Sequence, residues 1–185
     1  MKRLALILIV IMLPVCLVAE DGRPDAFLRM GEISTLKQAG VFNFSTRLEI
    51  ALSEEMQDAL RNGVRQIYVL ELQVRVPRFK IFHREVFSRK HRYELRYHAL
   101  SKKYLVKHIN SEAQLSFYTL SAALEHMSKI VDLPLLKEAS LSGIGDYDLR
   151  VKYMLDIEEL PLPLKIHALT NRDWRIATSW KEWLL

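Results

Sequence analysis

Residues 70–76 read Leu-Glu-Leu-Gln-Val-Arg-Val, and this alternation of apolar and polar side chains decides the fold class of the chain. Apolar residues at every second position place one face of a strand in a core and leave the other face in water. The same alternation recurs at 92–98 and at 149–158. Weaker examples mark four further strand candidates, at 27–36, 41–52, 103–109 and 164–169. The sequence therefore predicts a domain made mainly of half-buried strands.

Two segments have the apolar spacing of short helices that pack on a sheet. Ser53 suits the N-cap of the first helix, and Gly63 suits its end. Thr119 suits the N-cap of the second, whose apolar stripe continues to Val131, just before Pro134. We therefore expect two helices among the strands.

The connections indicate antiparallel pairing. Segments 85–98 and 103–109 are separated by a turn near 100–102, which is too short for a parallel crossover. We expect a mainly β, α+β fold: an antiparallel β-sandwich-like domain with two short helices. A single sheet covered by helices is the second choice.

The N-terminus has the composition of a secretory signal peptide. Lys2 and Arg3 precede an uncharged apolar run at 4–18, and Ala19 offers a small residue for cleavage. We expect residues 1–19 to be removed after export, which would place the protein in the periplasm or another extracytoplasmic compartment.

Two alternatives to cleavage remain open. An uncleaved segment would tether the domain to the inner membrane, although about 15 residues span roughly 23 Å as a helix, less than a hydrocarbon core of roughly 30 Å. A lipid-modified Cys16 is disfavoured because Pro14 and Val15 stand where small residues are needed. Cleavage would leave one domain at 20–185 with no cysteine, since Cys16 is the only one in the chain.

A basic stretch at 75–108 holds eleven Lys or Arg and only two Glu, whereas the whole chain has a net charge of +5. Basic residues interleaved with Phe can bind anions, but export argues against nucleic acid as the partner. An anionic membrane surface or a protein partner in the cell envelope fits better. Alternatively, these charges are the solvent side of strands and discourage edge pairing. The candidate anion-binding residues are Arg75, Arg78, Arg89, Lys90, Arg92 and Arg96.

The last twelve residues contain Trp174, Trp180 and Trp183. In a helix, Trp180, Trp183 and Leu184 would share one face. These aromatics either form an exposed patch for a partner or membrane surface, or dock into the core.

No motif in the sequence points to catalysis, a cofactor or a metal. The six histidines lack the spacing of metal ligands on a helix, and the D-x-D at 146–148 lacks the further oxygen ligands of a calcium loop. The serines lack a nucleophile elbow. We expect a non-enzymatic protein without a cofactor.

Several stretches together carry a resemblance that covers most of the chain after the signal. They are 52–64, 69–78, 92–100, Tyr104, 117–124, 160–164, Trp174, Ser179, Trp180 and Trp183. In these the chain resembles an uncharacterised family of exported proteobacterial proteins of similar length, sometimes labelled "proline-rich signal peptide protein". It departs from that label by having only six prolines. The resemblance implies an extracytoplasmic domain of unknown function, with no catalytic residue to carry over. It also implies a signalling context, because genes of the family often lie near those of sensor histidine kinases.

Two hypotheses of function follow. The first is a protein-binding module of the cell envelope, accessory to a membrane sensor kinase. The second is a carrier or sensor that holds an apolar small ligand between its layers. The aromatic side chains expected to point inward support the second, and they are Tyr93, Tyr97, Tyr104, Phe117 and Tyr153. An enclosed apolar pocket would favour the carrier, and an exposed patch would favour the binding module.

Overall fold

The computed structural model describes residues 26–78, 82–141 and 147–185. The predicted signal peptide, with Cys16, lies outside the described residues, as do 79–81 of the basic stretch. Within these ranges, no helix is both long enough and apolar enough to cross a membrane.

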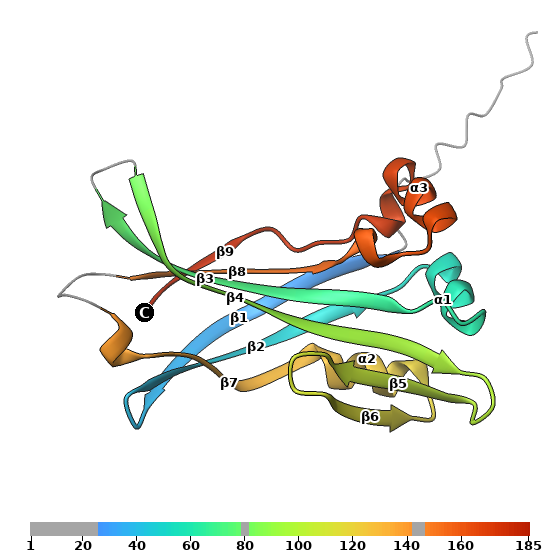
Figure 1. Ribbon diagram of the computed structural model, residues 1–185, viewed down its shortest axis with the longest axis horizontal. Helices are drawn as coiled ribbons and strands as arrows, with labels where there is room; N and C mark the ends of the chain where they lie inside the picture. The colour runs from blue at the N-terminus through green and yellow to red at the C-terminus, as the bar shows by residue number, and fades with distance from the viewer. Residues whose placement is uncertain (1–25, 79–81, 142–146) are drawn as a thin grey trace, which may run out of the picture.

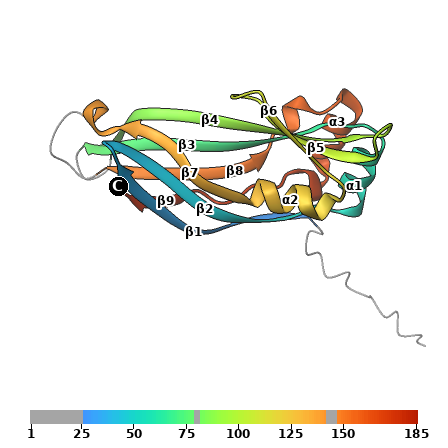
Figure 2. The ribbon, with the colours of Figure 1, turned by 90° about the horizontal axis from the view of Figure 1, so that it is seen from below.

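The described residues form nine strands in two antiparallel sheets, which face each other as two layers in Figure 2. The strands are β1 (Phe27–Gln38), β2 (Val41–Ala51), β3 (Gln66–Arg78), β4 (Phe82–His98), β5 (Lys103–His108), β6 (Ala113–Phe117), β7 (Lys129–Lys137), β8 (Asp148–Leu155) and β9 (Lys181–Leu184). One sheet has the order β1-β2-β7 and the other β6-β5-β4-β3-β8-β9 (Figure 1). The mainly β, sandwich-like fold is confirmed.

The core lies between the two layers and follows the predicted alternation. Leu70 and Leu72 of β3 and Val151 of β8 are fully buried. From the smaller sheet, Phe44 is fully buried and Leu48 nearly so. On the opposite face of β3, Glu71, Gln73 and Arg75 form part of the outer surface of the larger sheet, whereas Ile67 and Val69 are buried.

Two of the three helices among the described residues begin where the sequence predicts. The Ser53 side chain accepts a hydrogen bond from Met56 N at the start of α1 (Glu54–Arg61), and Gly63 follows the helix with a φ of 85°. The Thr119 side chain accepts from Ala122 N at the start of α2 (Leu120–Ser128).

The predicted extent of the second helix is wrong. The helix ends at Ser128, and the next residues form β7, in which Val131 is 71% exposed. Pairing of this segment with β2 overrides the helical spacing. Pro134 lies inside the strand, which is tolerated because β7 is an edge strand.

The strand predicted at 164–169 is also wrong, because this segment belongs to α3 (Leu162–Thr170). Pro163 stands in the first turn, where a missing N–H costs nothing, and Lys165 N donates to Pro161 O at 2.9 Å. Short 3₁₀ turns lie on both sides, at Ile157–Glu159 and Arg172–Trp174, and a third lies at Glu138–Ser140 after β7.

Candidate functional site

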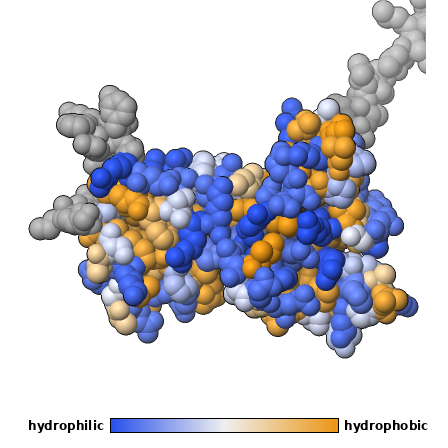
Figure 3. All heavy atoms as spheres, in the orientation of Figure 1, coloured by the Kyte–Doolittle hydropathy of each residue, from blue (hydrophilic) through white to orange (hydrophobic). Residues whose placement is uncertain are grey.

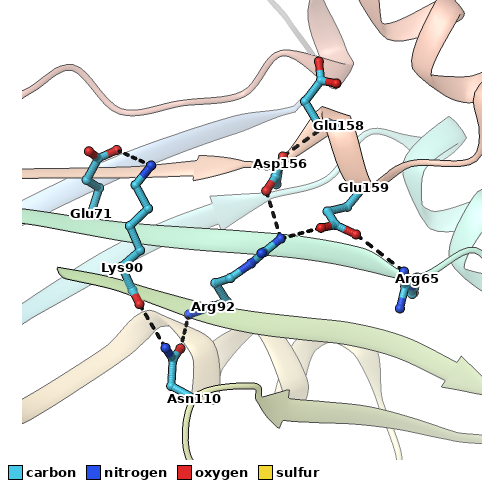
Figure 4. A network of polar contacts seen from close by, with 8 residues as sticks. All are labelled: Arg65, Glu71, Lys90, Arg92, Asn110, Asp156, Glu158 and Glu159. Carbon is cyan, nitrogen blue, oxygen red and sulfur yellow. Dashed lines mark hydrogen bonds and ion pairs between the residues drawn. The ribbon is translucent and has the colours of Figure 1, made fainter.

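Arg92 lies at the centre of a polar network on the outer face of the larger sheet (Figure 4). Its Nη2 lies 3.1 Å from Asp156 Oδ2 and 2.7 Å from Glu159 Oε1. Arg65 reaches the other carboxylate oxygen of Glu159 at 3.5 Å. The acidic partners come from the end of β8 and the turn after it, outside the basic stretch. Arg92 is therefore neutralised by residues distant in sequence.

Three further cations from the candidate set have acidic neighbours on this face. Arg75 Nη2 is 2.8 Å from Glu182 Oε1. Lys90 is 3.8 Å from a carboxylate oxygen of Glu71, and Arg96 is 3.7 Å from one of Glu94. The side chain of Arg78, the fifth candidate, lies outside the described part of the chain. This pairing favours the interpretation of the basic stretch as a charge-balanced solvent face.

Arg89 differs from the other candidates, because it lies on the opposite face of β4. It pairs in register with Leu72, whose side chain is buried between the layers. The Arg89 guanidinium lies 5.2 Å from the centre of the Phe87 ring, and its Nη1 is 3.5 Å from Pro134 O. Arg89 therefore spans from the larger sheet to the edge of the smaller one.

The contact made by Arg89 marks an opening between β4 and β7. It has a volume of about 380 Å³ and is lined by apolar residues from both sheets, with two cations at its rim. The apolar residues include Val86, Phe87, Leu135 and Leu136, and the cations are Arg89 and Lys137. Figure 3 shows hydrophobic surface on this side of the molecule, in the region between β4 and β7. We call this feature the β4–β7 opening.

The backbone of β4 is exposed along this opening because β5 is much shorter than β4. Their pairing stops at Tyr93 and His108. Beyond that point the Asn110 side chain takes the place of a strand, accepting from Arg92 N at 2.8 Å and donating to Lys90 O at 3.1 Å. Among the described residues, no strand pairs with the β5 side of β4 from Phe82, where β4 begins, to Arg92.

The direction of the exposed backbone groups follows from strand geometry. Both backbone groups of Arg92 point toward the β5 side, since Arg92 O also accepts from Ile109 N. Every second residue of an antiparallel strand points its backbone groups to the same side. The N–H and C=O of Ser88 therefore face the opening. The other border, β7, is an edge strand of its own sheet.

A histidine pair lies on the inner face of β4 and β5. His91 Nδ1 is 3.3 Å from His108 Nε2, and the Tyr93 ring stacks on His108 with centroids 4.8 Å apart. Burial lowers the pKa of both histidines. No group of three or more metal-ligating side chains occurs among the described residues.

The three tryptophans lie in three different environments. Trp174 is fully buried, and Trp180 is half-buried beneath the guanidinium of Arg150, 4.6 Å from its ring centre. Trp183 is 43% exposed and donates to Thr35 Oγ1 at 3.3 Å. The helical face proposed for the C-terminus is wrong, because β9 is a strand paired with β8. The tryptophans therefore form no single patch.

The sequence analysis did not find Ser88 or the exposed edges of β4 and β7. The signal that could have found them is the length mismatch between the predicted strands 85–98 and 103–109, since a short strand leaves part of a longer neighbour unpaired.

The comparison with protein families gives one finding. A family model described as a domain of unknown function, DUF4390, matches residues 27–184. No curated protein and no solved structure shows significant similarity to the chain. The matched range includes every strand and helix described above, so the chain belongs to the DUF4390 family, a domain of unknown function.

Proposed function

We propose that the protein is a non-enzymatic interaction module of the cell envelope, which binds an extended segment of a partner protein in the β4–β7 opening. The observation that carries this proposal is the exposed edge of β4 beside an apolar floor. The extracytoplasmic location rests on the signal-like residues at 1–19. A membrane sensor kinase is the partner class that the family resemblance implies.

Strand addition explains how the opening would bind. An extended peptide placed along β4 would hydrogen-bond to the backbone of Ser88, while every second side chain would enter the apolar floor. Main-chain bonds supply affinity in this mode, and the pockets for alternate side chains supply specificity. Arg89 and Lys137 at the rim favour a segment with acidic residues beside its apolar ones.

A proline at Ser88 tests this mode directly. Ser88→Pro removes the N–H that faces the opening while leaving the β3–β4 hydrogen bonds, so the fold should survive. A photo-crosslinker at Ser140, which also lines the opening, should capture an envelope protein in the native host. We expect Ser88→Pro to reduce this crosslink about tenfold, and the matched Ser88→Ala variant to keep it.

Two results would contradict the proposal. One is a crosslink that is equally strong with Ser88→Pro and with Ser88→Ala. The other is a captured set that does not differ from that of a crosslinker at Leu36, an exposed residue of β1. Circular dichroism of each variant verifies that the fold is intact.

The same opening supports a second candidate function, the binding of an apolar small ligand. Its volume of about 380 Å³ and its apolar lining suit such a molecule, and Arg89 suits an acidic head group. Aromatic side chains already fill part of the space between the layers, because the Tyr68 and Tyr153 rings stack there with centroids 5.9 Å apart. Native mass spectrometry of protein from its host should show a bound adduct if this function is correct, and a clean apo mass would count against it.

A further inference from the structure

The helix α3 has apolar residues on two of its sides, although only one of these sides packs on the domain. Ala168 is fully buried and Leu164 packs against the core. On the other side, Leu162, Ile166 and Leu169 are 69%, 59% and 57% exposed. A surface helix normally turns an apolar stripe to the core and polar residues to water, so the outer apolar side of α3 lacks a cover in this structure.

The three exposed residues form one continuous stripe. Positions i, i+4 and i+7 of a helix lie on the same face, one turn above another. A contiguous apolar surface of this kind on a soluble domain marks a binding surface, whereas single exposed leucines need no explanation. Figure 3 shows hydrophobic atoms gathered at this end of the molecule. We call these residues the α3 stripe.

Two polar side chains of α3, Lys165 and His167, have acidic partners within the domain. Lys165 forms an ion pair with Glu158, and His167 Nε2 is 3.0 Å from Glu55 Oε1. They contribute little net charge beside the stripe. The α3 stripe itself therefore offers an apolar contact to whatever covers it.

The position of α3 close to the start of the described chain indicates what covers the α3 stripe. Ala26, where the described chain begins, lines the same surface depression as Arg172 and Arg175, which follow α3. The apolar run 4–18 is separated from Ala26 by seven residues, which span at most roughly 25 Å. Whenever that run lies in a membrane, during export or as a retained anchor, α3 is within reach of the bilayer surface.

We propose that α3 docks on the surface of a lipid bilayer, with the α3 stripe inserted at the boundary between head groups and acyl chains. This is the mode of interfacial helices, which bury one apolar face to a depth of about 5–10 Å. The proposal rests on the extracytoplasmic location proposed above, but it is independent of peptide binding in the β4–β7 opening.

Site-specific fluorescence on the exported protein tests the proposal. Ile166→Cys and Leu36→Cys each give the exported protein a single cysteine, because Cys16 is removed with residues 1–19; both are labelled with an environment-sensitive dye and mixed with phosphatidylcholine vesicles. Leu36 is a matched control because it is 60% exposed and pairs with Asn43 next to the β1–β2 hairpin. Figure 1 shows this hairpin at the opposite end of the molecule from α3. We expect brominated lipids to quench the dye at 166 severalfold more than the dye at 36.

Lipid composition and substitutions complete the test. Replacing about a fifth of the lipid by phosphatidylglycerol, or adding ~0.5 M salt, should change binding by less than about twofold, because the contact is apolar. Leu162→Ser combined with Ile166→Ser should weaken vesicle binding about tenfold or more, whereas Leu36→Ser should not.

Three outcomes would overturn the proposal. The first is equal quenching at both labelled positions. The second is binding that needs phosphatidylglycerol and is lost in salt, which would assign membrane contact to the basic stretch. The third is unchanged binding of the double serine variant. None of these outcomes bears on the partner crosslink at Ser140, so the two proposals fail separately.

Discussion

At the scale of single residues, His91 is a titratable group placed where protonation is unfavourable. Its side chain is 7% exposed and faces His108. Burial lowers the pKa of His91 to about 4, and the charges of His108 and Arg89 act in the same direction. In an unfolded chain the pKa of histidine is about 6.5. Between these two values, the unfolded chain binds a proton that the folded protein does not.

The stability of the fold should therefore fall as the pH is lowered from about 6.5 to about 4, because the unfolded state binds more protons in this range. The contribution of His91 to this loss is on the order of 2 kcal/mol, after allowance for solvent screening. His91→Leu should flatten the pH dependence of the free energy of unfolding, measured by urea titration across this range. Ser88→Ala, on the outer face of the same strand, removes no titratable group and should keep the wild-type slope. An unchanged slope in His91→Leu would refute this assignment.

At the scale of elements, the start of α1 depends on one buried hydroxyl. Ser53 is 4% exposed, and its Oγ accepts from Met56 N at 3.3 Å. Ser53→Ala should lower the free energy of unfolding by about 1 kcal/mol, the usual cost of losing an N-cap. Urea unfolding measures this loss, and Ser53→Thr, which keeps the hydroxyl, should recover most of it. A loss that is the same in both variants would point to packing at this site instead of capping.

Caps and alternation were predictable from the sequence because they are local. Thr119 and Gly63 act on neighbours within one turn, and the alternation at 70–76 reports burial on one side. The segment at 129–137 was not predictable in this way, because its strand conformation comes from pairing with the distant β2. The misread strand at 164–169 did contain a local signal, the two prolines at its start. The β4–β7 opening depends on where β5 stops, which is a property of the sheet and not of either strand.

At the scale of the whole molecule, the two sheets are unequal, and this inequality creates the candidate site. Three strands face six, so the smaller sheet cannot cover the larger one completely. The helix α2 contacts β5 and β6 and covers part of the remainder. The side of β4 that lies beyond β5 receives no such cover from a strand or helix among the described residues, and it is there that the opening lies.

Amide hydrogen exchange should distinguish the covered strands of the larger sheet from the uncovered edge of β4. The amides of Leu70 and Leu72 in β3, which point their backbone groups toward β4, should exchange slowest, at a free energy close to global unfolding. Ser88 N–H should exchange at least about a hundredfold faster, because it faces the opening. Ser116 N–H should also exchange fast, since β6 is the outermost strand and its pairing with β5 leaves this group pointing outward. A partner segment added along β4 should then protect Ser88 and leave Ser116 unchanged, which separates strand addition at the opening from pairing at the outer edge of the sheet. Slow exchange of Ser88 in the unbound protein would mean that the edge of β4 is already covered in solution, and the proposed binding mode would fail with it.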